Sequence, residues 1–331
     1  MKVLVTGGAG FLGHHICTAL ESTGHTVVSF DIAIPRPDAH WETIQGSILD
    51  YAALTSAGSG CDAIIHTAAI AELWTLKSGM HHKMNVLGTQ NVIDVSKIVH
   101  ARLVYVSSYT SLIAGQRWPE RTLDENEEIV SDALLGLYPR SKREAELRVI
   151  SAAHEGVNAS IVLPPLLVGP GDHNLTPPSR MIRDLAPGKL PAYLDCFINM
   201  VDVRAVAAGV VQTLERGRSG ERYLLSGDDV RLGELTRKIA RLTGIPAPKI
   251  KVPYALALTV ANIEAGLSRM TGKSPNAPLT GVRLAGRAVK FANAKARREL
   301  GFEPGSLDDA LRASLAWMAG QELIPGLPAS P

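Results

Sequence analysis

Tyr138 and Lys142 stand four residues apart in the sequence, a spacing that places both side chains on one face of a helix. A tyrosine hydroxyl loses its proton near pH ~10, and a neighbouring cation lowers that pKa because it favours the phenolate. A phenol beside an ammonium group can therefore donate or accept the proton when an alcohol is oxidised or a carbonyl is reduced. The spacing is common by chance, so its meaning depends on the rest of the chain.

A glycine-rich turn follows the first apolar segment. The segment TGGAGFLG at residues 6–13 lies between a predicted strand at residues 3–6 and a predicted helix that runs to about Glu21. Its spaced glycines are Gly7, Gly10 and Gly13. This spacing permits a tight turn, a close approach of the backbone to a pyrophosphate, and close packing of the helix on a sheet. The sequence therefore predicts a dinucleotide site at this turn.

Asp31 ends the second predicted strand. A carboxylate at this position accepts hydrogen bonds from both ribose hydroxyls of NAD and repels the 2′-phosphate of NADP. NAD is therefore the expected cofactor, and NADP is less favoured. Two alternatives stay open: Asp31 could be a simple turn residue, and Arg36 is close enough in sequence to clamp a phosphate.

Short apolar segments alternate with helix-like segments in the N-terminal half. The predicted strands are residues 3–6, 26–30, 63–66, 103–107 and 160–163. The alternation predicts an α/β fold, a Rossmann-type doubly wound parallel sheet with a smaller C-terminal substrate lobe. Residues 1–170 are expected to bind NAD, with a later segment near residues 198–215 returning to this domain. We expect residues 171–320 to form mainly the substrate lobe and residues 321–331 a flexible tail.

The composition describes an ordinary globular protein. The chain has 331 residues, 46% apolar content and a net charge of +2, and its basic residues are spread along the sequence. The sequence therefore shows no electrostatic signature of binding to nucleic acid or to an anionic membrane. The N-terminus has no signal-peptide pattern, so a cytoplasmic location is predicted. Neither the three cysteines nor the paired histidines have metal-ligand spacing, so no metal site is predicted.

Together these features resemble the extended short-chain dehydrogenases/reductases, the NAD-dependent epimerase/dehydratase superfamily, over nearly the whole chain. The further matching segments are HTAA at residues 66–69, NVLGTQNV at 85–92, VYVSS at 104–108 and PPLLVGPGD at 164–172. The resemblance implies a Ser-Tyr-Lys triad formed by Ser108, Tyr138 and Lys142, with Ser107 as the less favoured serine. It is also compatible with a homodimer.

The resemblance assigns a role to each member of the triad. Ser108 would hydrogen-bond the substrate oxygen, Tyr138 would transfer the hydroxyl proton, and Lys142 would hold the nicotinamide ribose and lower the pKa of Tyr138. Cofactor contacts are implied along the whole dinucleotide. They are Gly7, Gly10, Phe11, Leu12, Gly13, Asp31, Ser47, Ile48, Ala68, Ala69, Asn85, Tyr138, Lys142, Pro164 and Leu167.

Three positions depart from the family pattern. Ser47 stands where the family usually has an aspartate that binds adenine, which puts that contact in doubt. Leu163 replaces an arginine before Pro164. In residues 199–206, NMVDVRAV, the usual histidine and paired aspartates are missing. Because those positions normally help to join the two lobes, we expect their network to be rebuilt.

The C-terminal half resembles dihydroflavonol-reductase-like enzymes, 3β-hydroxysteroid dehydrogenases and hopanoid-associated sugar epimerases. An apolar helix predicted at residues 253–270 favours a hydrophobic substrate. That helix is too short and too charged to span a membrane, and core packing within the substrate lobe is a more favoured role for it than contact with lipid. Residues 196–199 lack the arginine that clamps a diphosphate in many sugar epimerases, although other arginines could serve.

The predicted function is NAD-dependent interconversion of a secondary alcohol and a ketone on a small-to-bulky, hydrophobic substrate. The alternative is a nucleotide-sugar epimerase, which uses the same triad but keeps its NAD tightly bound. A non-catalytic dinucleotide sensor is less favoured, because such proteins commonly lose the tyrosine or the lysine. The acidic run at residues 125–128 is most simply a solvated face, or else a cover over the substrate.

Overall fold

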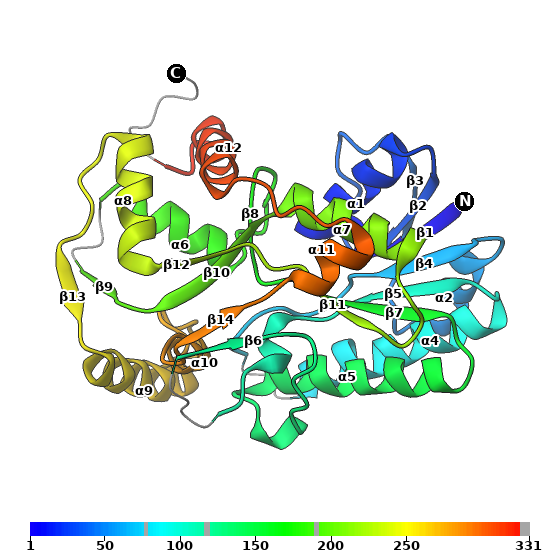
Figure 1. Cartoon of the computed structure of the whole chain (residues 1–331), viewed down its shortest axis with the longest axis horizontal. Coiled ribbons are helices and arrows are strands. Elements are labelled where there is room, and N and C mark those ends of the chain that lie inside the picture. The colour runs from blue at the N-terminus through cyan, green and yellow to red at the C-terminus, as the bar shows by residue number, and fades with distance from the viewer. Residues whose placement is uncertain (76–78, 116–119, 189–191, 325–331) are drawn as a thin grey trace.

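Seven parallel strands form the centre of the molecule (Figure 1). The structure, a computed structural model, describes residues 1–75, 79–115, 120–188 and 192–324. In spatial order the strands are β3 (Glu42–Gln45), β2 (Thr26–Asp31), β1 (Lys2–Thr6), β4 (Ala63–His66), β5 (Arg102–Val106), β7 (Ala159–Leu163) and β11 (Arg222–Leu224). The strands predicted above correspond to β1, β2, β4, β5 and β7, whereas β3, which was not predicted, is short and only partly buried. The Rossmann-type parallel sheet is confirmed.

Helices cover both faces of this sheet, so its strands are apolar on both sides. In β1, Val3 and Val5 belong to the core on one face and Leu4 to the core on the other, as the two-residue period of a strand requires. One face carries α1 (Phe11–Ser22), α7 (Val203–Arg216) and α11 (Ala294–Leu300). The opposite face carries α2 (Tyr51–Gly58), α4 (Gly88–Ile98) and α5 (Leu137–His154).

A smaller lobe with its own core lies beside the C-terminal ends of the strands (Figure 1). It contains a three-stranded sheet of β12 (Asp228–Arg231), β10 (Phe197–Asp202) and β8 (Leu166–Val168), packed with α6 (Pro177–Leu185), α8 (Leu232–Thr243) and α12 (Leu307–Gly320). Two further parallel pairs join β9 (Ala192–Leu194) to β13 (Ile250–Val252), and β6 (Arg121–Leu123) to β14 (Val289–Phe291). The helices α9 (Tyr254–Thr271) and α10 (Leu279–Ala285) complete the lobe.

The chain crosses between the lobes more often than the sequence suggested. Strand β10 lies in the smaller sheet, and α7 then packs on the large one. In addition, β11 joins the large sheet and α11 packs on its face. The expected tail is ordered at its start, because Ile324 is buried in the core of the smaller lobe. The rest of that predicted tail, residues 325–331, lies outside the described residues.

Helix α9 differs from its prediction. Only Ala261 and Ser268 of this helix are buried, and its large apolar side chains face outward. The expectation that it packs in the core was therefore wrong. Within the described residues, no helix is both long enough and apolar enough to cross a membrane.

Candidate active site

The C-terminal end of β5 carries the two candidate serines. Ser107 donates a hydrogen bond of 2.7 Å to the carboxylate of Glu146, which is fully buried. Ser108 begins a short 3-10 helix, Tyr109–Leu112, and its oxygen accepts hydrogen bonds from the backbone and side chain of Thr110 at 3.3 and 2.9 Å. Ser107 is thus held in the protein interior, and Ser108 is the serine that interacts with Tyr138.

Tyr138 lies in the first turn of α5 and is partly buried. Burial raises the pKa of its hydroxyl, and a hydrogen bond with Ser108 acts in the opposite direction. The sequence predicted that Lys142 would lower this pKa. In the structure burial outweighs every favourable interaction, so the phenol keeps its proton in the neutral range until a further positive charge approaches.

Lys142 is buried one turn further along α5. Its ammonium group donates a hydrogen bond of 2.6 Å to the carbonyl of Val106 and lies 4.4 Å from the ring centroid of Tyr105. Burial lowers the pKa of Lys142 to about 7, and the carboxylate of Glu146 opposes that shift. Lys142 therefore titrates close to neutral pH, at the same strand end as Ser108.

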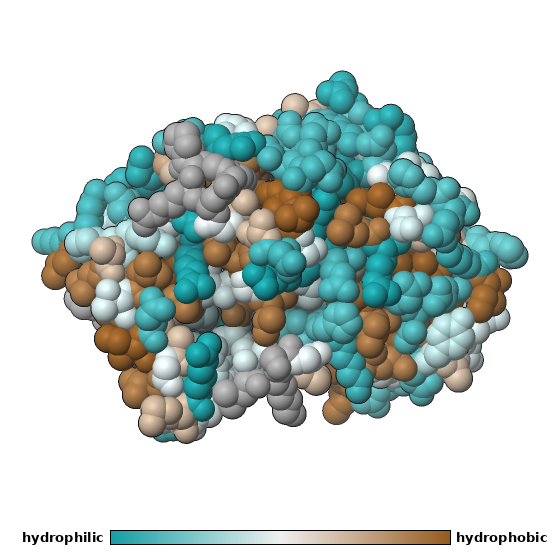
Figure 2. Space-filling view, turned by 90° about the horizontal axis from the view of Figure 1, so that it is seen from below, coloured by the Kyte–Doolittle hydropathy of each residue, from teal (hydrophilic) through white to brown (hydrophobic). Residues whose placement is uncertain are grey.

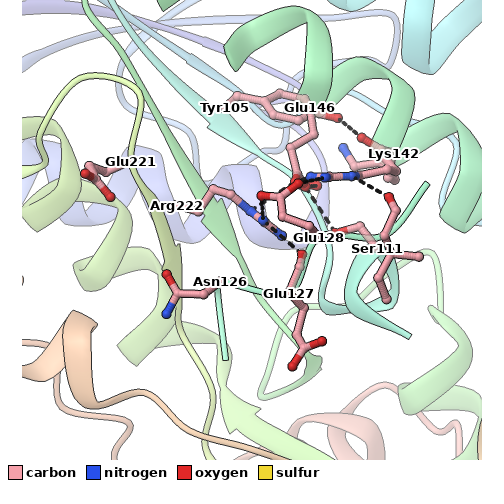
Figure 3. Close-up of polar contacts among 12 residues, drawn as sticks. Tyr105, Ser111, Asn126, Glu127, Glu128, Lys142, Glu146, Glu221 and Arg222 are labelled. Carbon is pink, nitrogen blue, oxygen red and sulfur yellow. Dashed lines mark hydrogen bonds and ion pairs between the residues drawn. The ribbon is translucent and has the colours of Figure 1, made fainter. Parts of the chain in front are cut away.

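Glu146 is the site residue that the sequence reasoning missed. It lies four residues after Lys142, and that spacing was the available signal because both occupy one face of α5. Its carboxylate accepts hydrogen bonds from Ser107 and from Ser111, the latter at 3.1 Å, and forms ion pairs with Arg143 and Arg222 (Figure 3). Glu146 thereby connects α5 to both sides of Ser108 and to strand β11.

The acidic run at residues 125–128 belongs to the same network and is not a simple solvated face. Glu128 forms an ion pair of 2.8 Å with Arg143 and another of 3.6 Å with Arg222 (Figure 3). Glu127 pairs with Arg121, and Glu125 is buried. The run therefore neutralises arginines that approach Glu146, which fixes the loop before α5.

The glycine turn has the shape that a pyrophosphate requires. Gly7 has φ +77°, and a Cβ there would stand 2.7 Å from the amide nitrogen of Ala68. A Cβ at Gly13 would stand 2.0 Å from the carbonyl oxygen of Gly7. Helix α1 then begins at Phe11, with Gly10 as its N-cap and no acidic residue in its first turn. The first turn of α1 therefore holds no carboxylate of its own that would compete with a bound anion for the backbone amides.

Asp31 and Arg36 both contact this turn. The Asp31 carboxylate accepts hydrogen bonds from the amides of Ala9 at 3.1 Å and Ala33 at 2.9 Å. The Arg36 guanidinium donates to the carbonyl of Ala9 at 3.0 Å and to that of Gly10 at 3.4 Å. Asp31, which suits the ribose of NAD, and Arg36, which suits the 2′-phosphate of NADP, therefore contact the same turn.

Asn85 supports the site through its neighbours. Its side chain bonds to the amide and carbonyl of Ile70, at 2.8 and 3.0 Å, and to Ser141 at 2.9 Å. It lies in a π-helical segment, His82–Leu87, a local widening that is frequent at functional sites. Both amide hydrogens are thus used to join the turn after β4, with Ala68 and Ala69, to helix α5.

The other predicted cofactor contacts lie along the same edge of the sheet. Ser47 accepts a hydrogen bond from the amide of Leu49 at 3.2 Å, and Ile48 is buried against Gly88. The carbonyl of Pro164 accepts from the amide of Tyr109 at 3.2 Å. Leu167 lies in β8 and pairs with Val201 of β10, at the start of the smaller lobe.

The segment that departs from the family pattern has a network of its own. Asn199 bonds to the backbone of Gly227 and, at 2.7 Å, to Asp229. The carboxylate of Asp229 also accepts from the amide of Phe291 at 3.2 Å. Asp202 caps α7 and forms an ion pair of 2.6 Å with Arg204. The rebuilt contacts therefore hold β10, β12 and β14 together.

These residues fit a dinucleotide at the C-terminal edge of the sheet, where open α/β folds bind such ligands. The glycine turn and α1 can hold the pyrophosphate, Asp31 the adenosine ribose, and Lys142 the nicotinamide ribose. Within the described residues no group of three His, Cys, Asp or Glu side chains is arranged to hold a metal. The arrangement suits transfer of a proton at Tyr138 next to a bound nicotinamide.

Comparisons with known proteins agree with this geometry. The model of the NAD dependent epimerase/dehydratase family matches residues 3–225. A Synechocystis sp. protein named after dihydroflavonol 4-reductase is 32% identical over 325 residues, which cover 95% of this chain and 93% of the relative. A 3 beta-hydroxysteroid dehydrogenase/Delta 5→4-isomerase of Mycobacterium tuberculosis is 29% identical over 334 residues, which cover 92% and 86%.

A solved structure shows the same fold over the whole length. A nucleoside-diphosphate-sugar epimerase from Pseudomonas aeruginosa is 26% identical, covers 98% of this chain and 99% of its own, and has a TM-score of 0.78. The chain therefore belongs to the NAD-dependent epimerase/dehydratase family and is an NAD(P)-dependent enzyme of the extended short-chain dehydrogenase/reductase type.

Proposed function

We propose that this enzyme interconverts a secondary alcohol and a ketone on a hydrophobic substrate, with net transfer of a hydride to or from NAD. The observation that carries the proposal is the meeting of Tyr138, Ser108 and Lys142 at the C-terminal end of β5. Both serine and tyrosine can hydrogen-bond one substrate oxygen. A buried cation completes the set beneath them.

Each side chain has a distinct task in this proposal. Ser108 donates a hydrogen bond to the substrate oxygen and stabilises the charge that develops there. Tyr138 accepts the hydroxyl proton during oxidation and returns it during reduction. Lys142 binds the nicotinamide ribose and orients it toward the same oxygen. The cofactor, when bound, supplies hydride exchange at its nicotinamide ring.

An apolar substrate is supported by the names of two relatives, and the segments next to Tyr138 include α10 of the smaller lobe. The two relatives described above are named for a flavonoid reductase and a steroid dehydrogenase. The proposal places the substrate entrance beside helix α10, which approaches the start of α5: a Cβ at Gly136, two residues before Tyr138, would stand 2.5 Å from the side chain of Thr280. A Cβ at Gly281 of α10 would likewise stand 3.3 Å from the side chain of Leu73. Apolar walls retain apolar ligands in proportion to the area they bury.

NAD is the proposed cofactor in preference to NADP. Asp31 accepts two backbone hydrogen bonds and is held at the ribose side of the glycine turn, where its charge would repel a 2′-phosphate. Asp31 also faces Arg36, which it helps to keep protonated. The homodimer and the cytoplasmic location stay predictions from the sequence.

The alternative function is a nucleotide-sugar epimerase with tightly held NAD. One solved relative carries that activity in its name. The test is turnover by the purified protein of a panel of sterols, terpenoid alcohols, aromatic alcohols and UDP-sugars, with NAD and NADP compared. We expect steady NADH formation on an apolar alcohol. Sugar interconversion without free NADH would instead assign the epimerase.

A further inference from the structure

Helix α9 presents an uncovered apolar stripe. Its members recur at alternating intervals of four and three residues, so they lie along one face of the helix. They are Leu256, Val260, Ile263, Leu267 and Met270. These side chains are between 44% and 85% exposed. Figure 2 shows the corresponding side of the molecule, where brown residues gather at the left, over the position of α9 in Figure 1.

The opposite face of α9 is the one that packs against the protein. Ala261 and Ser268 are its buried residues, and α10 is its neighbouring helix. Ala261, Ser268 and the ring of Tyr254, which lies against Gly286, therefore attach α9 to the lobe, and the five side chains of the stripe point away from it. Leaving five large apolar side chains in water is costly, so a stripe of this size usually marks a contact surface.

Basic residues surround the stripe. Lys249 and Lys251 precede the helix next to the exposed Ile250, and Arg269 and Lys273 lie at its C-terminal end. Among the residues that the structure describes, Lys251 alone of these four forms an ion pair, with Asp195 at 3.1 Å. The carboxylate of Glu264 is bound to the amide of Ala277 and to Asn276. Basic residues therefore flank the apolar stripe at both ends of α9.

The stripe is one helix away from the proposed substrate entrance. Helix α10 contacts α9 on one side, and its Thr280 approaches Gly136 beside Tyr138. A molecule that enters beside α10 would therefore approach the site from the end of the lobe that carries α9. The stripe and the entrance belong to the same end of the smaller lobe.

We propose that α9 docks this enzyme on an anionic lipid surface, with the apolar stripe among the acyl chains and the basic residues against the phosphates. An interfacial helix of this kind lies in the plane of the membrane, binding through its apolar area and through electrostatic attraction. Such docking would bring the entrance to apolar substrates dissolved in the lipid. That benefit rests on the proposed function, whereas the docking itself does not.

The area of the stripe favours a lipid surface over a second copy of the chain. Five half-exposed side chains present on the order of 500 Å², whereas each partner in a stable protein interface buries about 800 Å². A lipid surface has no such requirement, because it adapts to the shape of the helix. The basic rim would also repel the same rim on a second copy, while it attracts anionic phosphates.

The test is co-sedimentation of the full-length protein with vesicles of phosphatidylcholine alone and of phosphatidylcholine mixed with phosphatidylglycerol. We expect binding to the mixed vesicles at low salt and weaker binding at high salt. The double variant Ile263→Gln/Leu267→Gln keeps good helix formers in place and should lower the partition coefficient by about tenfold or more. The double variant Arg269→Gln/Lys273→Gln should lower the partition coefficient only for the mixed vesicles, because only these carry negative charge.

Matched controls separate docking from folding. Ile98→Gln and Leu147→Gln replace exposed apolar residues on α4 and α5 and should leave vesicle binding unchanged. Wild-type protein that stays in the supernatant, or a double variant that binds normally, would overturn the proposal. So would a wild-type dimer that the double variant converts to a monomer without any vesicle binding.

Activity on a water-soluble ketone, measured without vesicles, distinguishes this proposal from the proposed function. We expect the double variant to match the wild type in that assay. If the wild type binds vesicles and the double variant does not, but neither reduces the ketone, the docking proposal stands and the proposed alcohol–ketone interconversion is rejected.

Discussion

At the residue scale, the proposed chemistry depends on two side chains of α5, the Tyr138 phenol and the buried Lys142 amine. Burial raises the pKa of Tyr138 and lowers that of Lys142 to about 7, so both shifts are toward the neutral form. The Tyr138 hydroxyl is therefore a proton donor in the resting protein. Reduction of a ketone uses that protonated form, whereas oxidation of an alcohol uses the phenolate.

Replacing Tyr138 by Phe tests this assignment directly. We expect Tyr138→Phe to lower kcat by about 10³-fold, because general acid–base catalysis typically contributes that much, while NAD binding persists. Tyr109→Phe is the matched control, since Tyr109 is a buried tyrosine next to Ser108. Steady-state kinetics with ligand titration measures both variants. Full activity in Tyr138→Phe would exclude the proposed proton transfer.

The pH dependence of stability reports on Lys142. Its pKa is about 7 in the folded protein against 10.5 for a free lysine, so between these values the unfolded chain binds the extra proton. The free energy of unfolding therefore rises with pH in this window, and the energetic cost of burying Lys142 is greatest below pH 7. Lys142→Met removes this dependence.

Thermal unfolding of the cofactor-free wild type and Lys142→Met checks the prediction at pH values from about 6, below the folded pKa of about 7, to about 10, near the free value of 10.5. We expect the advantage of the variant to be largest near pH 6 and to shrink toward pH 10. A difference in Tm that stays constant across this range would show that Lys142 does not titrate there.

At the element scale, α5 and the end of β5 are fixed to each other by Glu146. Its carboxylate binds Ser107 and Ser111 on either side of Ser108, and α5 carries Tyr138 and Lys142. A single buried carboxylate therefore sets the relative position of all three members of the triad. The arginines around it, Arg143 and Arg222, neutralise its charge.

Glu146→Gln should destabilise the protein by about 3 kcal/mol, because removing one member of a buried ion pair leaves the other uncompensated. It should also lower kcat, because Ser108 is no longer held in place. Glu144→Gln is the control: Glu144 is on the exposed side of α5 and pairs with Arg148 at 3.8 Å, which predicts a change below about 0.5 kcal/mol. Chemical denaturation and kinetics of both variants measure the contrast. Equal losses of stability and kcat in the two variants would contradict the role of Glu146 in holding Ser108 in place.

At the scale of the whole molecule, two lobes meet at the C-terminal edge of a parallel sheet. The strand order changes direction between β1 and β4, and open α/β sheets bind dinucleotides at such a point. The glycine turn follows β1 there, and the triad stands on β5 and α5 nearby. The smaller lobe, which the chain enters and leaves repeatedly, forms the other side of the site.

Cofactor binding should therefore stabilise the whole molecule. NAD at a hundredfold excess over its Kd should add about 2.7 kcal/mol to the free energy of unfolding, and NADP at the same concentration should add less. Asp31→Ala should reduce that difference, because it removes the charge that repels a 2′-phosphate. Thermal shift titrations with both nucleotides measure it. A wild type that NADP stabilises more strongly than NAD would reverse the proposed preference.

The sequence by itself determined the parallel sheet, the glycine turn and the positions of Ser108, Tyr138 and Lys142. The sheet, the glycine turn and the Tyr138–Lys142 pair depend on local spacing, on hydrophobic periodicity and on motifs of consecutive residues, whereas Ser108 was implied by the family resemblance. The short β3 escaped this reasoning, because a half-buried strand of four residues carries little periodic signal.

Only the tertiary structure decided how distant residues share one environment. It joined Glu146 to Ser107 and Arg222, placed the acidic run beside Arg143, and left the stripe of α9 uncovered by the part of the chain that the structure describes. Burial and charge pairing depend on which segments the fold brings together, and an apolar helix pattern is the same whether its outer face meets protein, water or lipid.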